Sequence, residues 1–348
     1  MDGSSMPGIY NQASCLRQEG RHDPAGRHPY DSSLGSVGRM DAKDVRIFCE
    51  LAFKEMGSRA FIQKPLSPAG IAKKLRLDEK TVRLRVKKME EAGFIKYYQV
   101  TPELALFGLK CLALYRFEAM NVATKYGVVK HVQGLPGVVQ AFDYLGPTLS
   151  ISVAGESSTR VQQLGDEIAA RFELQKMDLG EDQVGEPHAN PDRLDWRIIE
   201  RLRYDARSTH KEVADALSIT PRMAQYRIRK LRDSGAVLVR AVINPQRQEG
   251  LVFYELGVTV DREERRNVLG ELQEKYGEKL WSVRESASGV LLLNLFGFTL
   301  GEPEEAAMEL LKIQGVRWCS ILILKEVLEP SRPNWIDVLI QEEIASRK

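Results

Sequence analysis

Two segments of the sequence concentrate cationic side chains, and their spacing is that of one helix face. Residues 220–234 contain five Lys or Arg and one Asp, whereas residues 78–92 contain five Lys or Arg and four Asp or Glu. Guanidinium and amide groups that project from a helix can form bidentate hydrogen bonds with guanine and adenine edges in the major groove. These segments therefore predict recognition of duplex DNA.

Apolar residues at helical spacing separate a buried seam from an outward face in both segments. The seams are Val82, Val86 and Met89 in the first segment, and Ala224, Ile228 and Leu231 in the second. The predicted DNA-binding residues are Lys80, Arg83, Arg85, Lys87 and Lys88, and Arg222, Gln225, Tyr226, Arg227, Arg229 and Lys230. Two alternatives stay open: the cations can form a solvated helix face, and Arg85 and Arg227 can tie each helix to its own domain.

Other kinds of site lack their usual residue spacing. The four cysteines include no CxxC pair and the five histidines include no HExxH spacing, so we predict no metal site, no disulfide framework and no cofactor. The chain offers no catalytic constellation. No apolar run approaches the roughly 18 residues that cross a bilayer, and the N-terminus lacks the hydrophobic stretch of a signal peptide. We therefore expect a cytoplasmic protein with no membrane partner.

The sequence repeats itself at a fixed offset. An ungapped comparison of residues 75–95 with residues 217–237 has an offset of 142. The identical pairs include Ala72/Ala214, Leu75/Leu217, Arg85/Arg227, Lys88/Lys230 and Gly93/Gly235. Upstream, Asp44 and Asp195 are 151 residues apart, which leaves nine extra residues (151 − 142) around residues 57–65 of the first copy. We predict an internal duplication.

The second copy carries the start and stop signals of three helices. Residues 194–202 repeat apolar side chains at helical spacing. Thr209 and Glu212 have the spacing of a capping box, which predicts the start of a second helix. Pro221 suits the first turn of a third helix, and Gly235 suits its C-terminal cap. A helix-turn-helix places this third helix in the major groove.

The first copy keeps the same punctuation with a different sequence. Ser67 and Pro68 mark the start of its second helix, and Gly93 marks the end of its third. A short β-prone run follows each helix triplet, at residues 94–100 and 237–243, and we expect each run to form a wing. Strand and helix patterns then alternate in the order βαββαβ in both copies.

The predicted fold class is α+β, with two tandem copies of a winged helix-turn-helix followed by a ferredoxin-like βαββαβ domain. The two sheets should pair face to face as an intramolecular pseudo-dimer, with residues 149–154 and 290–298 lining the contact. The predicted domains are a disordered tail at 1–39, winged helix-turn-helix 1 at 40–102, ferredoxin-like domain 1 at 103–182, a linker at 183–192, winged helix-turn-helix 2 at 193–245, ferredoxin-like domain 2 at 246–329, and a C-terminal tail at 330–348 that can form a helix.

This arrangement resembles the leucine-responsive regulatory protein (Lrp/AsnC) family of transcription regulators. The matching motifs are Leu194-Asp-Trp-Arg-Ile-Ile-Glu-Arg-Leu, Asp205-Ala-Arg-Ser, Arg227-Ile-Arg-Lys-Leu and Asn244-Pro245 in the second copy, and Arg85-Val-Lys-Lys-Met-Glu-Glu-Ala-Gly-Phe-Ile in the first. The resemblance implies a small-molecule effector in the βαββαβ domains and assembly with further copies. Many members carry a Gly followed by Asp at the effector turn. The turns Leu145-Gly-Pro-Thr-Leu and Ser286-Ala-Ser-Gly-Val-Leu lack that Asp.

The sequence thus predicts a transcription regulator that binds double-stranded DNA specifically and reads asymmetric half-sites with two non-identical recognition helices. We predict that the chain is not an enzyme. One alternative is a scaffold that uses its winged helices for protein contacts. The other is an enzyme similar to siroheme decarboxylases, which resemble the same fold. His131 is the only histidine in the βαββαβ segments that could approach porphyrin carboxylates.

Overall fold

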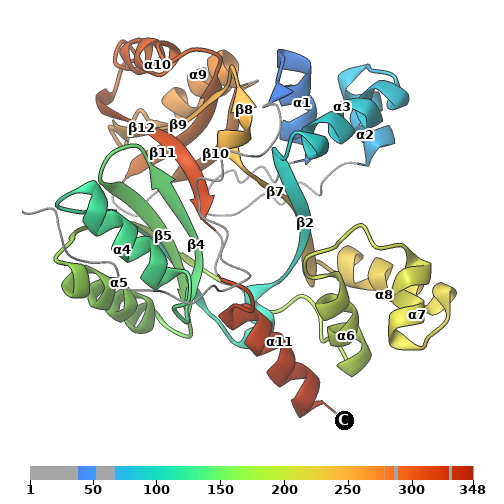
Figure 1. Cartoon of the computed structure of the whole chain (residues 1–348). Coiled ribbons are helices and arrows are strands. Elements are labelled where there is room, and N and C mark those ends of the chain that lie inside the picture. The colour runs from blue at the N-terminus through green and yellow to red at the C-terminus, as the bar shows by residue number, and fades with distance from the viewer. Residues whose placement is uncertain (1–37, 52–66, 278, 286–288, 329–330, 348) are drawn as a thin grey trace, which may run out of the picture. The chain divides into compact units, whose positions relative to one another are not determined.

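The computed structural model describes residues 38–51, 67–277, 279–285, 289–328 and 331–347 (Figure 1). The predicted disordered tail up to residue 37, the extra residues at 57–65 and the first three residues of the Ser286 turn lie outside these ranges. Helices and strands follow the predicted order along the rest of the chain.

Two helix triplets begin and end at the predicted signals. They are α1 (Ala42–Leu51), α2 (Pro68–Leu75) and α3 (Glu79–Glu91), and α6 (Arg193–Leu202), α7 (His210–Leu217) and α8 (Pro221–Asp233). The Ser67 side chain caps α2, and Thr209 forms the predicted capping box with Glu212 at α7. Gly93 and Gly235 follow the third helices with φ of 74° and 81°, which is the left-handed region that favours glycine.

The two β-prone runs form strands but not separate wings, which corrects the expectation from sequence. Strand β2 (Ile95–Pro102) pairs antiparallel with β7 (Val237–Ile243), so the two runs form one two-stranded ribbon. Each strand forms backbone hydrogen bonds along one edge with the strand that follows the other helix triplet. The ribbon therefore connects the two helix-turn-helix units.

Two βαββαβ units carry the remaining regular structure. The first contains β3 (Cys111–Glu118), α4 (Val122–Val132), β4 (Val138–Tyr144), β5 (Thr148–Gly155), α5 (Ser158–Phe172) and β6 (Gln175–Gln183). The second contains β9 (Val252–Val260), α9 (Arg265–Tyr276), β10 (Leu280–Glu285), β11 (Val290–Gly297), α10 (Glu302–Leu310) and β12 (Val316–Leu328). Short elements complete the chain: β1 (Gly38–Arg39), η1 (Leu104–Phe107), η2 (Pro245–Arg247), β8 (Gln248–Glu249) and α11 (Trp335–Ser346).

The two units share one eight-stranded sheet in the order β10-β11-β9-β12-β4-β5-β3-β6. The 13-residue strand β12 makes this possible, because residues 316–323 pair with β9 and residues 324–328 pair with β4. Faces of the two halves also meet, since Leu292 of β11 packs with Leu114 of β3 and Leu179 of β6. The predicted lining strands were β11 and β5; the cluster contains β11 together with β3 and β6. The edge pairing of β12 with β4 was not predicted.

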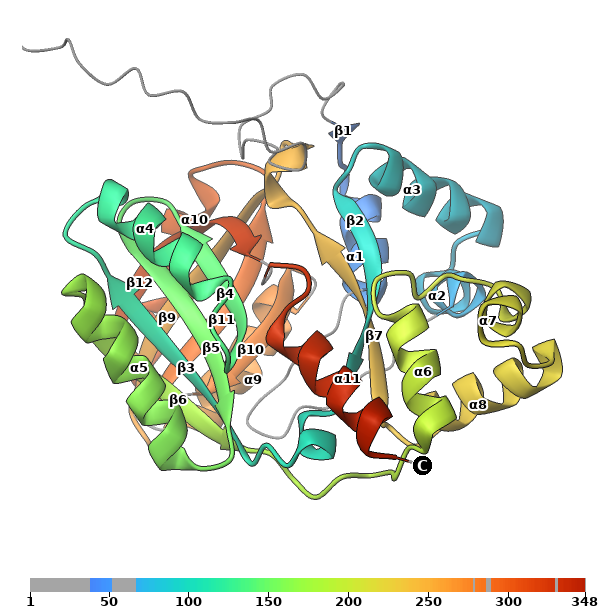
Figure 2. The same cartoon turned by 60° about the horizontal axis from the view of Figure 1, so that its bottom comes forward.

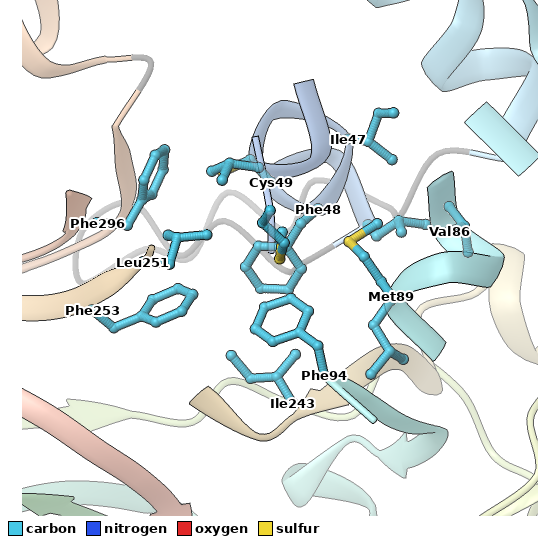
Figure 3. Packing of buried hydrophobic residues seen from close by; sticks show 14 of the residues in the cluster. Ile47, Phe48, Cys49, Val86, Met89, Phe94, Ile243, Leu251, Phe253 and Phe296 are labelled. Atoms are coloured by element: carbon cyan, nitrogen blue, oxygen red, sulfur yellow. The ribbon is translucent and has the colours of Figure 1, made fainter. Parts of the chain in front are cut away.

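The two helix-turn-helix units pack against different supports. In the first unit, Phe48 of α1 and Phe94 lie in one core with Phe253 and Phe296 of the second βαββαβ unit (Figure 3). In the second unit, Trp196 of α6 lies in a core with η1 and with α11. Helix α11 lies along α6 (Figure 1, Figure 2). No helix in the described part of the chain combines the length and apolar character needed to cross a membrane.

Candidate nucleic-acid interface

Helix α8 presents an outward row of polar side chains. Thr220 caps the helix and Pro221 occupies its first turn, while Ala224 and Leu231 are buried as predicted. Five predicted DNA contacts of α8 are exposed, and four of them form this row: Arg222, Gln225, Tyr226 and Arg229. None of these four side chains has a hydrogen bond or an ion pair within the described residues. The row is thus available to a partner outside the chain.

Arg227 of α8 points the other way. Its Nη1 lies 2.6 Å from Asp192 Oδ2 and 2.8 Å from Asp195 Oδ1, and Asp195 is fully buried. The hydrogen bond to Asp192 raises the pKa of the Arg227 guanidinium above its usual range. Lys230 Nζ lies 3.6 Å from Asp195 Oδ2. These contacts hold α8 against the start of α6, so Arg227 already has two carboxylate partners.

Arg85 of α3 makes the same clamp in the first unit. Its Nη1 lies 2.8 Å from Asp41 Oδ1 and 2.7 Å from the buried Asp44 Oδ1. Lys88 donates to the Arg39 carbonyl at 3.0 Å. These contacts agree with the alternative given in the sequence analysis, in which Arg85 and Arg227 hold each helix to its own domain. The sequence prediction did not include these acidic partners. A signal for them was present, because two aspartates three residues apart stand at the start of the first helix of each unit, Asp41 and Asp44 in one and Asp192 and Asp195 in the other, at the same offset of 151.

The outward cations of α3 are largely paired along the helix. Arg83 Nε donates to Glu79 Oε1 at 2.9 Å, and Lys87 Nζ lies 3.4 Å from Glu91 Oε1. Lys80 is the one predicted contact of α3 whose side chain has no such partner in the part of the chain that the structure describes. Leu84, at the position equivalent to Tyr226, is 58% exposed. Helix α3 therefore offers less free positive charge than α8 does.

A second contact joins the two units besides the β2–β7 ribbon. Arg207, in the turn between α6 and α7, lies 2.6 Å from Glu90 of α3 and stacks 4.1 Å from the ring centroid of Tyr98 in β2. Tyr98 in turn donates to Glu90 at 2.8 Å. Burial, followed by this hydrogen bond, raises the pKa of Tyr98 well above its usual range. The contact links the end of α3 to the second helix-turn-helix.

Three other features from the sequence analysis are His131, the turn at Gly146 and the question of a metal site. His131 packs on the ring of Phe172, and burial together with the charge of Arg171 lowers its pKa. The turn at Gly146 leaves Leu145 exposed. Within the described residues, His, Cys, Asp and Glu side chains form no group of three that could hold a metal ion.

Comparisons with known proteins bear on both the helix-turn-helix and the whole fold. A family model described as winged helix-turn-helix DNA-binding matches residues 191–237. The siroheme decarboxylase NirDL shares 14% identity and has a TM-score of 0.50, and the match covers 87% of this chain and 99% of that chain. AsnC from E. coli shares 16% identity over 39% of this chain and 92% of its own, with a TM-score of 0.33.

A transcriptional regulator from Neisseria meningitidis, solved with L-Met, shares 20% identity over 38% of this chain and 89% of its own, with a TM-score of 0.33. A search of the curated proteins finds no match. The match with the decarboxylase corrects one expectation from sequence, namely that the chain is not an enzyme. That protein is an enzyme, and its fold matches 87% of this chain. The chain therefore combines a segment that matches a winged helix-turn-helix DNA-binding family with a fold similar to that of the decarboxylase.

Proposed function

We propose that this chain is a sequence-specific DNA-binding transcription regulator of the Lrp/AsnC type, in which α8 is the principal reading helix. The observation that carries the proposal is the outward row Arg222, Gln225, Tyr226 and Arg229, exposed and without partners in the described residues. Arg and Gln suit guanine and adenine edges, and Tyr226, which is 68% exposed, adds an apolar surface. The match of residues 191–237 to a DNA-binding family supports this assignment.

The clamp at Arg227 supports the same role. Base readout needs a helix whose side chains are held in a fixed position relative to the domain. Arg227 pairs with Asp192 and Asp195, whereas Tyr226 and Arg229 have no hydrogen bond or ion pair among the described residues. Within α8, Arg227 therefore positions the helix, and the exposed side chains of the row are available to contact bases.

The two halves of one chain, as an internal duplication, would contact one duplex asymmetrically. Lys80 of α3 has no partner among the described residues, whereas Arg83 and Lys87 are paired with acids along the helix. We expect two dissimilar half-sites about one helical turn apart, or a multiple of it, with the stronger half bound by α8. A small-molecule effector and further copies of the chain are proposed partners.

The test begins with selection of bound sequences from a random duplex library, followed by binding titrations on the selected site. Alanine at Arg222 and Gln225 should cost on the order of 1 to 3 kcal/mol per lost bidentate contact and relax base preference in one half-site. The charge-matched control is alanine at Arg266 and Gln273, which are exposed on α9. Unchanged affinity and preference of the Arg222 and Gln225 variant would rule out α8 as the reading helix.

Tetrapyrrole binding is a second candidate, and the observation in its favour is the fold shared with a siroheme decarboxylase over 87% of the chain. Titration of the protein into siroheme, followed by absorbance, tests it. A saturable shift of the absorption bands at one equivalent would favour this candidate. The Arg222 and Gln225 variant should leave that shift unchanged, which separates the two functions experimentally.

A further inference from the structure

Outside the α8 face, one hollow of the surface combines free positive charge with an apolar floor. It has a volume of about 560 Å³ and is lined by Arg193, Leu194 and Arg197 of α6 and by Ile344 of α11. Pockets that hold small molecules commonly have volumes of about 300 to 1,000 Å³. The hollow is therefore large enough for a small organic ligand.

Arg193 and Arg197 have no counterion among the described residues. Both side chains are exposed, and neither has a hydrogen bond or an ion pair with any described residue. The neighbouring arginines do have partners: Arg203 pairs with Asp337, Arg227 with Asp192, and Arg347 with Glu343. Like charges four residues apart on a helix repel each other, so Arg193 and Arg197 destabilise α6 slightly unless an anion lies between them.

The floor of the hollow is continuous with the core of the second helix-turn-helix. Leu194 and Ile344 are partly buried, and both pack against the cluster that contains Trp196 and Ile340. An apolar group seated there would extend that core. A simple inorganic anion would use the arginines but leave the apolar floor exposed to water.

Among the described residues, the first unit lacks the pair of arginines that lines this hollow. Ala42 stands at the position equivalent to Arg193, and α1 packs on Phe253 and Phe296 instead of on a helix like α11. Only the second unit combines the arginine pair with a supporting C-terminal helix. The feature is therefore not a general property of the helix-turn-helix fold.

We infer that this hollow binds a small organic carboxylate with an aliphatic or aromatic body, whose carboxylate lies between Arg193 and Arg197 and whose body covers Leu194 and Ile344. Guanidinium groups bind carboxylates with paired, charge-assisted hydrogen bonds. The site lies on α6, one residue after Asp192, which holds Arg227 of α8. This inference stands independently of DNA binding.

Isothermal titration calorimetry on the full chain tests the inference, with octanoate as the probe. Octanoate should bind at one site per chain, and acetate and octanol should bind at least about tenfold more weakly, because each lacks one of the two recognised features. The R193Q/R197Q variant should weaken octanoate binding about tenfold or more, whereas R262Q/R266Q should leave it unchanged. I344S should weaken octanoate more than acetate.

Three results would overturn the inference. Octanol could bind as tightly as octanoate, which would mean that the charge has no role. R193Q/R197Q could bind octanoate like the unaltered chain, which would place the probe elsewhere. Octanoate could fail to bind both the unaltered chain and R193Q/R197Q, while this variant binds duplex DNA more weakly and with a flatter salt dependence, which would assign the arginines to phosphate contacts. Circular dichroism of each variant confirms that it is folded.

Discussion

The two helix-turn-helix units hold their third helices by the same clamp but leave different surfaces free. Arg85 reaches Asp41 and Asp44, and Arg227 reaches Asp192 and Asp195, with nearly equal distances. The outward cations differ in their partners. The acids at 79 and 91 pair with Arg83 and Lys87 along α3. In α8, Pro221 stands at the position equivalent to Glu79, and Asp233, equivalent to Glu91, pairs with Arg232 instead of with an outward cation of the row. The scaffold of a reading helix can therefore be retained while its surface charge changes.

The supports of the two units differ as well. The first unit is joined to the second βαββαβ unit through stacked and edge-on rings, with Phe253 centroids 6.3 Å from Phe48 and 6.0 Å from Phe94. The second unit is joined to α11, whose Asp337 accepts hydrogen bonds from Arg203 and Tyr204. The first support is apolar, and the second includes a buried polar network. The two should respond differently to substitution.

The largest effect is expected from F253A. Phe253 is 2% exposed, and its removal leaves a cavity beside Phe48 and Phe94, so the free energy of unfolding should fall by about 3 to 5 kcal/mol. The matched change in the second unit is F107A. The ring centroid of Phe107 lies 5.3 Å from that of Trp196, and Phe107 is only partly buried. F107A should cost about half as much. Urea denaturation compares them, and a larger loss for F107A would reverse the proposed ranking of the supports.

The next largest effect is expected from D337A. Arg203 is 6% exposed and would keep a charge without its carboxylate partner, so we expect a loss of roughly 2 to 4 kcal/mol. E342A, an exposed change on the same helix, should cost less than about 0.5 kcal/mol. Thermal and urea unfolding followed by circular dichroism measure both. Equal, small losses would mean that α11 does not depend on this network.

A charge change on α3 should make it behave more like α8. E79Q/E91Q frees Arg83 and Lys87 from their helix partners. If α3 lies on DNA, affinity should rise and the slope of log K against log salt should steepen by about 1 to 2. The control is E304Q/E305Q on α10, which removes the same charge elsewhere. An unchanged slope would argue that α3 does not contact the duplex.

The smallest effect concerns acid stability of the clamps. Burial would raise the pKa of Asp192, but hydrogen bonds from Arg227 and from the Asp195 backbone lower it below the ordinary value of 3.8. A lowered pKa in the folded state stabilises the protein above the unfolded pKa, and this stabilisation is lost as pH falls below about 4. D192N should therefore flatten the stability profile between about pH 4 and pH 2. D41N should do the same in the first unit, where the pKa of Asp41 is also lowered.

Chemical denaturation across that pH range checks the prediction. Both carboxylates are more than half exposed, at 55% and 58%, so the change should be modest. A profile for D192N that falls as steeply as that of the unaltered chain would show that other acids dominate the acid transition.

Local patterns in the sequence were sufficient to predict helices, caps and the βαββαβ order. The capping box at Thr209 starts a helix, and the glycines at 93 and 235 end one. Each of these signals involves residues only a few positions apart, so it can be recognised in the sequence alone. The outward direction of Arg222, Gln225, Tyr226 and Arg229 also followed from helical periodicity, and all four are exposed.

Tertiary structure decided which distant groups meet. The pairing of β2 with β7, the joining of β12 to β4, and the choice of Asp192 and Asp195 as partners for Arg227 bring together residues tens to hundreds of positions apart. A strand pattern specifies which side chains face a core but not which strand supplies the hydrogen bonds at its edge. Helical spacing places Arg227 at the border of the buried seam, but this position is the same whether the side chain contacts DNA or a carboxylate of its own domain. Its partner is therefore determined by the packing of α6 against α8, because that packing places two carboxylates within 3 Å of the guanidinium.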